Sequence, residues 1–131
     1  MVYVLKTVSI LGSTGSVGKN TLEVISSLSD RFHVYAISCN QNTSLLHEQI
    51  IKYKPRVAVI TNHEKYNAFL NEYGNEIGTT RVLFGDEGLN EISSHDDVDI
   101  VVAAIVGFEC LRPTVDAIST NKTVILYLIH I

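Results

Sequence analysis

The sequence predicts a doubly wound α/β fold, which is a parallel sheet with helices on both faces. Short apolar runs of the β type alternate with amphipathic helical patterns along the chain, and this alternation is typical of right-handed βαβ crossovers. A nearly continuous apolar run at residues 99–105 indicates a central parallel strand that is covered on both faces. A glycine-rich stretch at residues 12–18 separates the first predicted strand from the first predicted helix.

The first βαβ unit is predicted from residues 7–11, 16–28 and 32–38. Residues 7–11 and 32–38 are rich in apolar and β-branched side chains and form the first two strands. The helix between them has apolar side chains at helical spacing, which predicts one stripe facing the sheet. This stripe consists of Val17, Thr21, Val24, Ile25 and Leu28.

The second unit continues with a helix at residues 43–52 and a third strand at residues 56–60. The inner side of this helix is predicted from Leu45, Leu46, Gln49, Ile50 and Tyr53. Pro55 ends the helix, because a proline disfavours helical geometry in the residue before it.

The second half of the chain repeats the alternation. Asn62 is suited to cap a helix that runs to about Tyr73, and Gly74 suits its end. The remaining predicted strands are residues 80–84, 99–105 and 123–131, and the remaining helices are residues 86–93 and 111–120. Pro113 is acceptable in the first turn of the last helix.

Composition places this fold in one ordinary domain. The chain has 131 residues, of which 46% are hydrophobic and 18% are charged, and this excludes intrinsic disorder. The net charge is −4 and the basic residues are scattered, which argues against a nucleic-acid or membrane surface. Cys39 and Cys110 form neither a metal-binding spacing nor a disulfide framework, so a reducing, cytoplasmic setting is expected.

The glycine-rich stretch predicts a Rossmann-like dinucleotide-binding turn. Gly12 permits a tight turn, Gly15 lets the backbone approach a pyrophosphate, and Gly18 lets helix and strand pack closely. The helix N-terminus presents free N–H groups to the phosphates, and Thr14 and Ser16 add hydroxyl donors. The simpler alternative is a glycine-rich turn without a ligand, but the strand-turn-helix context favours the nucleotide site.

The segment after the second strand favours NADP over NAD. Folds of this kind that bind NAD place an acidic residue there, about 20 residues beyond the glycines, on the ribose 2′-hydroxyl. Residues 38–44 read Ser-Cys-Asn-Gln-Asn-Thr-Ser and contain no acid, so a 2′-phosphate would meet no repulsion. The same loop is also expected to cap the next helix through Thr43.

The end of the central strand is a third candidate contact. Ala103, Ala104 and Ile105 lie where the strand reaches the carboxyl edge of the sheet, and small side chains there allow a nicotinamide and its ribose to approach the backbone. Tight packing of the strand against a helix explains the same residues equally well.

The sequence offers no catalytic residue and no metal ligand. Cys110 could be a nucleophile at a helix start, but a small buried apolar role suits it better. The acidic run of Asp96, Asp97 and Asp99 precedes a strand and is interpreted as a solvated turn rather than a metal site.

Two motifs in order resemble the N-terminal NADPH-binding domain of the 1-deoxy-D-xylulose 5-phosphate reductoisomerase family. The first is Ile-Leu-Gly-Ser-Thr-Gly-Ser-Val-Gly at residues 10–18, followed by Thr-Leu-Glu-Val-Ile at residues 21–25. The second is Ala-Ala-Ile-Val-Gly at residues 103–107, followed by elements of the same family pattern at Leu111, Pro113, Thr114, Ala117, Ile118, Lys122 and Thr123. The resemblance extends to about Leu126.

The resemblance implies that residues 1–131 form an NADPH-binding domain. The family is an oxidoreductase that reduces and rearranges 1-deoxy-D-xylulose 5-phosphate to 2-C-methyl-D-erythritol 4-phosphate in non-mevalonate isoprenoid biosynthesis. It uses NADPH and a divalent metal, Mg²⁺ or Mn²⁺, and forms homodimers. By the same resemblance Thr14, Gly15, Ser16 and Val17 would hold the pyrophosphate. The family's Gly-Lys-Asn falls on Asn40, Gln41 and Asn42, of which only Asn42 matches.

The resemblance stops near the end of the chain. The family continues with Ala-Asn-Lys-Glu after residues 122–126, whereas this chain continues Tyr-Leu-Ile-His-Ile at residues 127–131. The family's metal-binding acids and substrate-phosphate site lie further along the family's sequence. We therefore expect that this chain is a piece of a longer protein, or that its end results from a frameshift, and that the chain alone is inactive. The alternatives are a non-catalytic nucleotide-binding module and another NADP-dependent dehydrogenase, one resembling aspartate-semialdehyde dehydrogenase.

Overall fold

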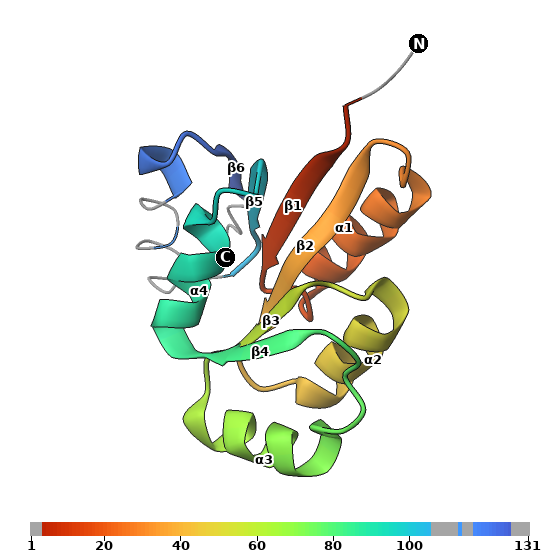
Figure 1. Ribbon diagram of the computed structural model, residues 1–131, viewed down its shortest axis with the longest axis vertical. Coiled ribbons are helices and arrows are strands. Elements are labelled where there is room, and N and C mark those ends of the chain that lie inside the picture. The colour runs from red at the N-terminus through yellow and green to blue at the C-terminus, as the bar shows by residue number, and fades with distance from the viewer. Residues whose placement is uncertain (1–3, 106–112, 114–116, 127–131) are drawn as a thin grey trace.

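The computed structural model describes residues 4–105, 113 and 117–126 (Figure 1). Its six strands are β1 (Lys6–Leu11), β2 (Phe32–Cys39), β3 (Val57–Ile60), β4 (Arg81–Phe84), β5 (Ile100–Ala103) and β6 (Thr123–Leu126). They form one sheet in the order β4-β3-β2-β1-β5-β6, and every neighbouring pair is parallel. The order reverses direction beside β1, as the predicted doubly wound fold requires.

Four helices connect the first five strands, one between each strand and the next. They are α1 (Ser16–Ser27), α2 (Thr43–Tyr53), α3 (His63–Tyr73) and α4 (Gly85–Ser94). Each of these helices was predicted, with ends within a few residues of the observed ones. Of the predicted helix at residues 111–120, the structure describes residues 113 and 117–120, of which 113 and 117–119 are helical. The last predicted strand is described only as far as Leu126.

The helices lie on two faces of the sheet, with a core under each. Figure 1 shows α1 and α2 on one side of the strands and α4 on the other. The first core joins α1, α2 and α3 to the sheet and includes Ile10, Leu22, Ile37, Leu46, Ile50 and Phe69. The second core joins α4 and Ala117 to the opposite face and includes Leu11, Val59, Leu89, Ile92 and Val101. No helix in the described part of the chain is long and apolar enough to cross a membrane.

A bulge in β2 changes which face its side chains occupy. Val8 pairs with Val34, but the next residue, Ser9, pairs with Ala36, so Tyr35 is the extra residue. Tyr35 and Ala36 therefore both belong to the core under α4, while Val34 belongs to the core under α1. A simple alternation of faces does not describe this strand.

The stripe predicted for α1 is rotated from the one observed. The buried residues are Gly18, Leu22 and Ile25, whereas Val24 is 56% exposed. The physical reason is the close contact at Gly18, where a Cβ would lie 2.1 Å from the carbonyl oxygen of Gly12. That contact turns the face containing Gly18 toward the sheet.

The observed N-terminal cap of α3 is the predicted residue, whereas that of α2 is not. The side chain of Asn62 accepts a hydrogen bond from the backbone N–H of Lys65 at 3.0 Å, as predicted for the start of α3. The cap of α2 is Asn42 rather than the predicted Thr43, because the Asn42 side chain accepts from the N–H of Leu45 at 3.3 Å.

Candidate nucleotide-binding site

The turn between β1 and α1 requires glycine at its first position. Gly12 has φ of +84°, a conformation that other residues rarely adopt. A Cβ on Gly12 would also lie 2.9 Å from Cγ1 of Ile105 and 3.1 Å from the carbonyl oxygen of Ala104. The backbones that follow β1 and β5 therefore approach each other closely at this turn.

The other two glycines differ in what surrounds them. A Cβ on Gly15 would meet nothing nearer than the Gly12 carbonyl oxygen at 3.9 Å, so the space beside this residue is open. A Cβ on Gly18 would overlap both the Gly12 carbonyl oxygen and Cα of Ser13, at 2.1 and 2.5 Å. Gly18 thus has the packing role predicted for it, whereas a side chain at Gly15 would meet no close contact.

A buried polar network fixes the turn to the neighbouring elements. The Ser13 hydroxyl donates to Oε1 of Gln49 at 2.7 Å, and Nε2 of Gln49 donates to the Ser13 carbonyl at 2.9 Å. The N–H of Gly12 donates to the Ser38 hydroxyl at 2.8 Å. Sequence reasoning missed these positioning roles, although a glutamine on the inner side of α2 was a usable signal, because a buried amide needs partners.

A cleft of about 370 Å³ lies at the carboxyl edge of the sheet. Its walls come from the glycine turn, from the ends of β2 and β3, from the start of α4 and from the residues after β5. They are formed by Gly12, Thr14, Gly15, Ser38, Cys39, Asn40, Thr61, Asp86, Leu89, Ala104 and Ile105. The three segments that the sequence singled out therefore meet in one cleft at the topological switch point.

Half of the predicted contact residues line this cleft, namely Gly12, Thr14, Gly15, Asn40, Ala104 and Ile105. Gly18 and Ala103 are buried and do not line it, and Ser16 is exposed at the start of α1. Gln41 is exposed in the loop beyond Asn40, and Asn42 is the α2 cap. Val17 lies in a different hollow, which is apolar, has about the same volume and lies between α1 and the strands β5 and β6.

Three residues that line the cleft were not predicted from the sequence, namely Thr61, Asp86 and Leu89. Nδ2 of Asn40 donates to the Thr61 hydroxyl at 2.8 Å, and that hydroxyl donates to the Cys39 carbonyl at 3.4 Å. Thr61 follows β3 and Asp86 follows β4 after one residue, so their place at the carboxyl ends of parallel strands was an available signal.

The charge around the cleft is uneven. Among the described residues that line it, Asp86 alone carries a carboxylate, and none is a lysine or an arginine. The N-terminus of α2 has no acidic residue in its first turn, so its positive dipole end is not neutralised. Burial raises the pKa of the Cys39 thiol to about 12, which keeps this cleft residue neutral.

No metal-binding cluster accompanies the cleft in the part of the chain that is described. Within it, no three His, Cys, Asp or Glu side chains come close enough to hold a metal ion. Oδ2 of Asp99 accepts a hydrogen bond from the N–H of Thr7 at 2.9 Å, which places the acidic run at the opposite, amino edge of the sheet. Cys110 lies outside the described residues.

Sequence comparisons identify relatives over nearly the whole chain. The family model for 1-deoxy-D-xylulose 5-phosphate reductoisomerase matches residues 8–127. The reductoisomerase of Saccharophagus degradans is 40% identical over 93% of this chain and 31% of its own length. That of Halothermothrix orenii is 42% identical over 90% of this chain and 30% of its own length. The chain thus spans about 30% of the length of these curated relatives.

Solved structures agree with the sequence matches. A DOX-P reductoisomerase in complex with magnesium superposes with a TM-score of 0.90 at 32% identity, over 95% of this chain and 31% of that one. The Zymomonas mobilis reductoisomerase in complex with NADPH gives a TM-score of 0.84 at 32% identity, over 94% of this chain and 32% of that one. The matches decide against a dehydrogenase resembling aspartate-semialdehyde dehydrogenase. This chain belongs to the 1-deoxy-D-xylulose 5-phosphate reductoisomerase family.

Proposed function

We propose that residues 1–131 are the NADPH-binding domain of a 1-deoxy-D-xylulose 5-phosphate reductoisomerase. The observation that carries this proposal is the cleft at the carboxyl edge, where the glycine turn meets the ends of β2 and β5. Two solved relatives were crystallised in complex with NADPH, and both superpose on this chain at 32% identity.

The pyrophosphate would lie on the turn between β1 and α1. Gly15 leaves room for it, and the helix that starts at Ser16 offers unpaired backbone N–H groups with no acidic residue in its first turn. Thr14 and Ser16 supply hydroxyl donors. Val17 would contribute its backbone N–H, because its side chain lies in the apolar hollow.

The 2′-phosphate would lie at the loop formed by Asn40, Gln41 and Asn42. This loop leads directly into α2, whose N-terminal dipole favours a negative charge. The amide groups of the loop are neutral donors and no acid opposes the phosphate there, which supports a preference for NADP over NAD. Gln41 supplies no positive charge, so the phosphate is held by hydrogen bonds and the helix dipole.

The nicotinamide would lie at the end of β5 against Ala103, Ala104 and Ile105. Ala104 and Ile105 line the cleft after β5 and Asn40 lines it after β2, with β1 between these strands, so the alanine end matches the far end of an extended dinucleotide. NADPH supplies the hydride in the family's reaction. The residues of this chain would orient the ring and exclude water from one of its faces.

Binding is tested by calorimetry with NADPH and the Gly15→Val variant. A branched side chain would occupy the place of the pyrophosphate, while φ of −76° at Gly15 allows any residue, so the fold should survive and binding should be lost. The control is Ser26→Val, an exposed position on the same helix. Unchanged affinity in Gly15→Val would overturn the proposal, and tighter binding of NADH than of NADPH by the wild-type chain would overturn the NADP preference.

The complete reaction is proposed only for a longer protein. It converts 1-deoxy-D-xylulose 5-phosphate to 2-C-methyl-D-erythritol 4-phosphate with NADPH and Mg²⁺ or Mn²⁺, in a cytoplasmic homodimer. The chain alone should not turn over substrate, because its described residues include no group of three metal-ligating side chains. The assay is the absorbance of NADPH with substrate and metal present. Turnover by the purified chain would contradict this expectation.

A further inference from the structure

We infer that Asp86 selects the base of the bound dinucleotide by accepting a hydrogen bond from the exocyclic amino group of adenine. This inference rests on the proposed nucleotide site and adds a specificity determinant to it. Asp86 lines the cleft, but it comes from α4, far along the chain from the glycine turn and from the loop after β2.

The order of the strands decides which half of the nucleotide reaches Asp86. With the pyrophosphate on the turn after β1, the nicotinamide half extends toward β5, where Ala104 and Ile105 lie. The adenosine half must then extend the other way, across the ends of β2 and β3. The cleft residues at that end include Asn40, Thr61 and Asp86.

The two faces of the sheet separate the ribose phosphate from the base. The loop that starts at Asn40 continues into α2, whereas Asp86 is in the first turn of α4. These helices belong to different cores and lie on opposite sides of the strands (Figure 1). A 2′-phosphate directed toward α2 is thus kept away from the carboxylate, and the base is directed toward α4.

Among the polar side chains at this end of the cleft, Asp86 has a carboxylate that is available to accept a hydrogen bond from the base. In the described chain, no hydrogen bond or ion pair involves its carboxylate. The Thr61 hydroxyl, in contrast, accepts from Asn40 and donates to the Cys39 carbonyl. Leu89, one turn further along α4, adds an apolar wall.

A carboxylate at this position discriminates between bases by its chemistry. A carboxylate can only accept hydrogen bonds, and the 6-amino group of adenine is a donor. Hypoxanthine has a carbonyl oxygen at the same position, so it would place two acceptors opposite each other. A site that pairs with one of these groups rejects the other, because its own polar group is left unpaired.

The experiment compares the affinities of the full chain for NADPH, its hypoxanthine analogue (deamino-NADPH) and NADH. We expect the wild-type chain to bind NADPH about tenfold more tightly than deamino-NADPH. Asp86→Asn should abolish or reverse that ratio, since an amide can donate to the hypoxanthine oxygen, and should leave the ratio of NADPH to NADH unchanged. Glu87→Gln is the matched control, because Glu87 is the adjacent acid and does not line the cleft.

Three outcomes would overturn the inference. An unchanged ratio of NADPH to deamino-NADPH in Asp86→Asn would show that this side chain does not contact the amino group. A rise in NADPH affinity relative to NADH in the same variant would show that the carboxylate faces the 2′-phosphate instead. Failure of the wild-type chain to bind NADPH would overturn the proposed function together with this inference. The first two results, in contrast, would overturn only the role of Asp86. Asp86 is exposed, so the variant should fold, and thermal unfolding verifies this.

Discussion

At the scale of single residues, two buried serines near the turn differ in their hydrogen bonding. Ser9 and Ser13 are both fully buried. The Ser9 hydroxyl has no partner within the part of the chain the structure describes, whereas the Ser13 hydroxyl bonds to Gln49. Burial of an unpaired hydroxyl costs free energy, and burial of a paired one does not cost as much.

We expect replacement by alanine to have opposite effects on stability at Ser9 and at Ser13. Ser9→Ala should raise the free energy of unfolding by about 1 kcal/mol, because it removes an unpaired polar group. Ser13→Ala should lower it by about 1–3 kcal/mol, because Oε1 of Gln49 loses its donor in a buried site. Urea unfolding of both variants measures the difference. Destabilisation by Ser9→Ala would mean that its hydroxyl has a partner after all.

At the scale of the element, α1 is positioned by a glycine rather than by its apolar stripe. Apolar periodicity correctly predicted that this helix is amphipathic, but not which side faces the sheet. That side is set by the approach of Gly18 to Gly12 and Ser13, a contact between backbones that periodicity does not record. The start of α2 also differs from the prediction, because the side chain that caps it belongs to Asn42 and not to Thr43.

Gly18→Ala should destabilise the domain even though alanine favours helices over glycine by about 1 kcal/mol. The added Cβ would overlap the Gly12 carbonyl oxygen, and overpacking of this kind costs roughly 1–3 kcal/mol or more. Gly15→Ala is the control, because its Cβ has open space and its φ is ordinary. Circular dichroism during thermal unfolding tests this. Equal melting temperatures would contradict the role assigned to Gly18.

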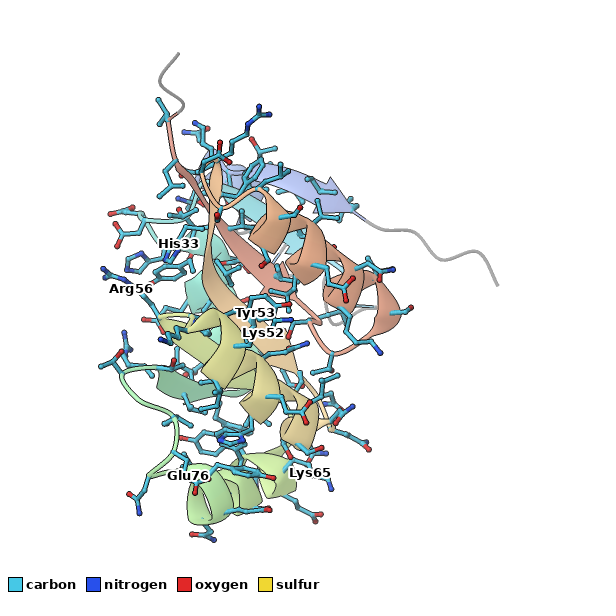
Figure 2. All side chains as sticks on the ribbon, turned by 90° about the vertical axis from the view of Figure 1, so that its right-hand side faces the viewer. His33, Lys52, Tyr53, Arg56, Lys65 and Glu76 are labelled. Carbon is cyan, nitrogen blue, oxygen red and sulfur yellow. The ribbon has the colours of Figure 1, made fainter. Side chains whose placement is uncertain are left out.

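At the scale of the whole molecule, an apolar hollow lies between a helix and the edge of the sheet. Exposed charged side chains border the α2 and α3 side, where Figure 2 labels Lys52, Lys65 and Glu76. The other end of the same face carries the apolar hollow between α1 and the edge strand β6. Val24 and Ile125 line this hollow and are 56% and 47% exposed. Within the described residues β6 is an edge strand of the sheet, and an edge strand beside exposed apolar side chains promotes self-association.

We therefore expect the chain to self-associate as its concentration rises. Ile125→Lys should shift the equilibrium toward monomer, because it places a charge on the edge strand. The control is Ile51→Lys, since Ile51 is 53% exposed on α2 and lies outside the hollow. Sedimentation equilibrium over a range of concentrations measures the effect. A wild-type chain that stays monomeric, or an equal response to both substitutions, would contradict the expectation.

The sequence by itself determined the element order, the parallel sheet, the glycine turn and the family, because each depends on local periodicity or on an ordered motif. Only the tertiary structure decided the rotation of α1, the bulge at Tyr35 and the presence of Asp86 in the cleft. Asp86 shows the reason most directly. It is distant in sequence from Gly12 and Asn40, and it joins them only because parallel strands end at one edge of the sheet and α4 starts there.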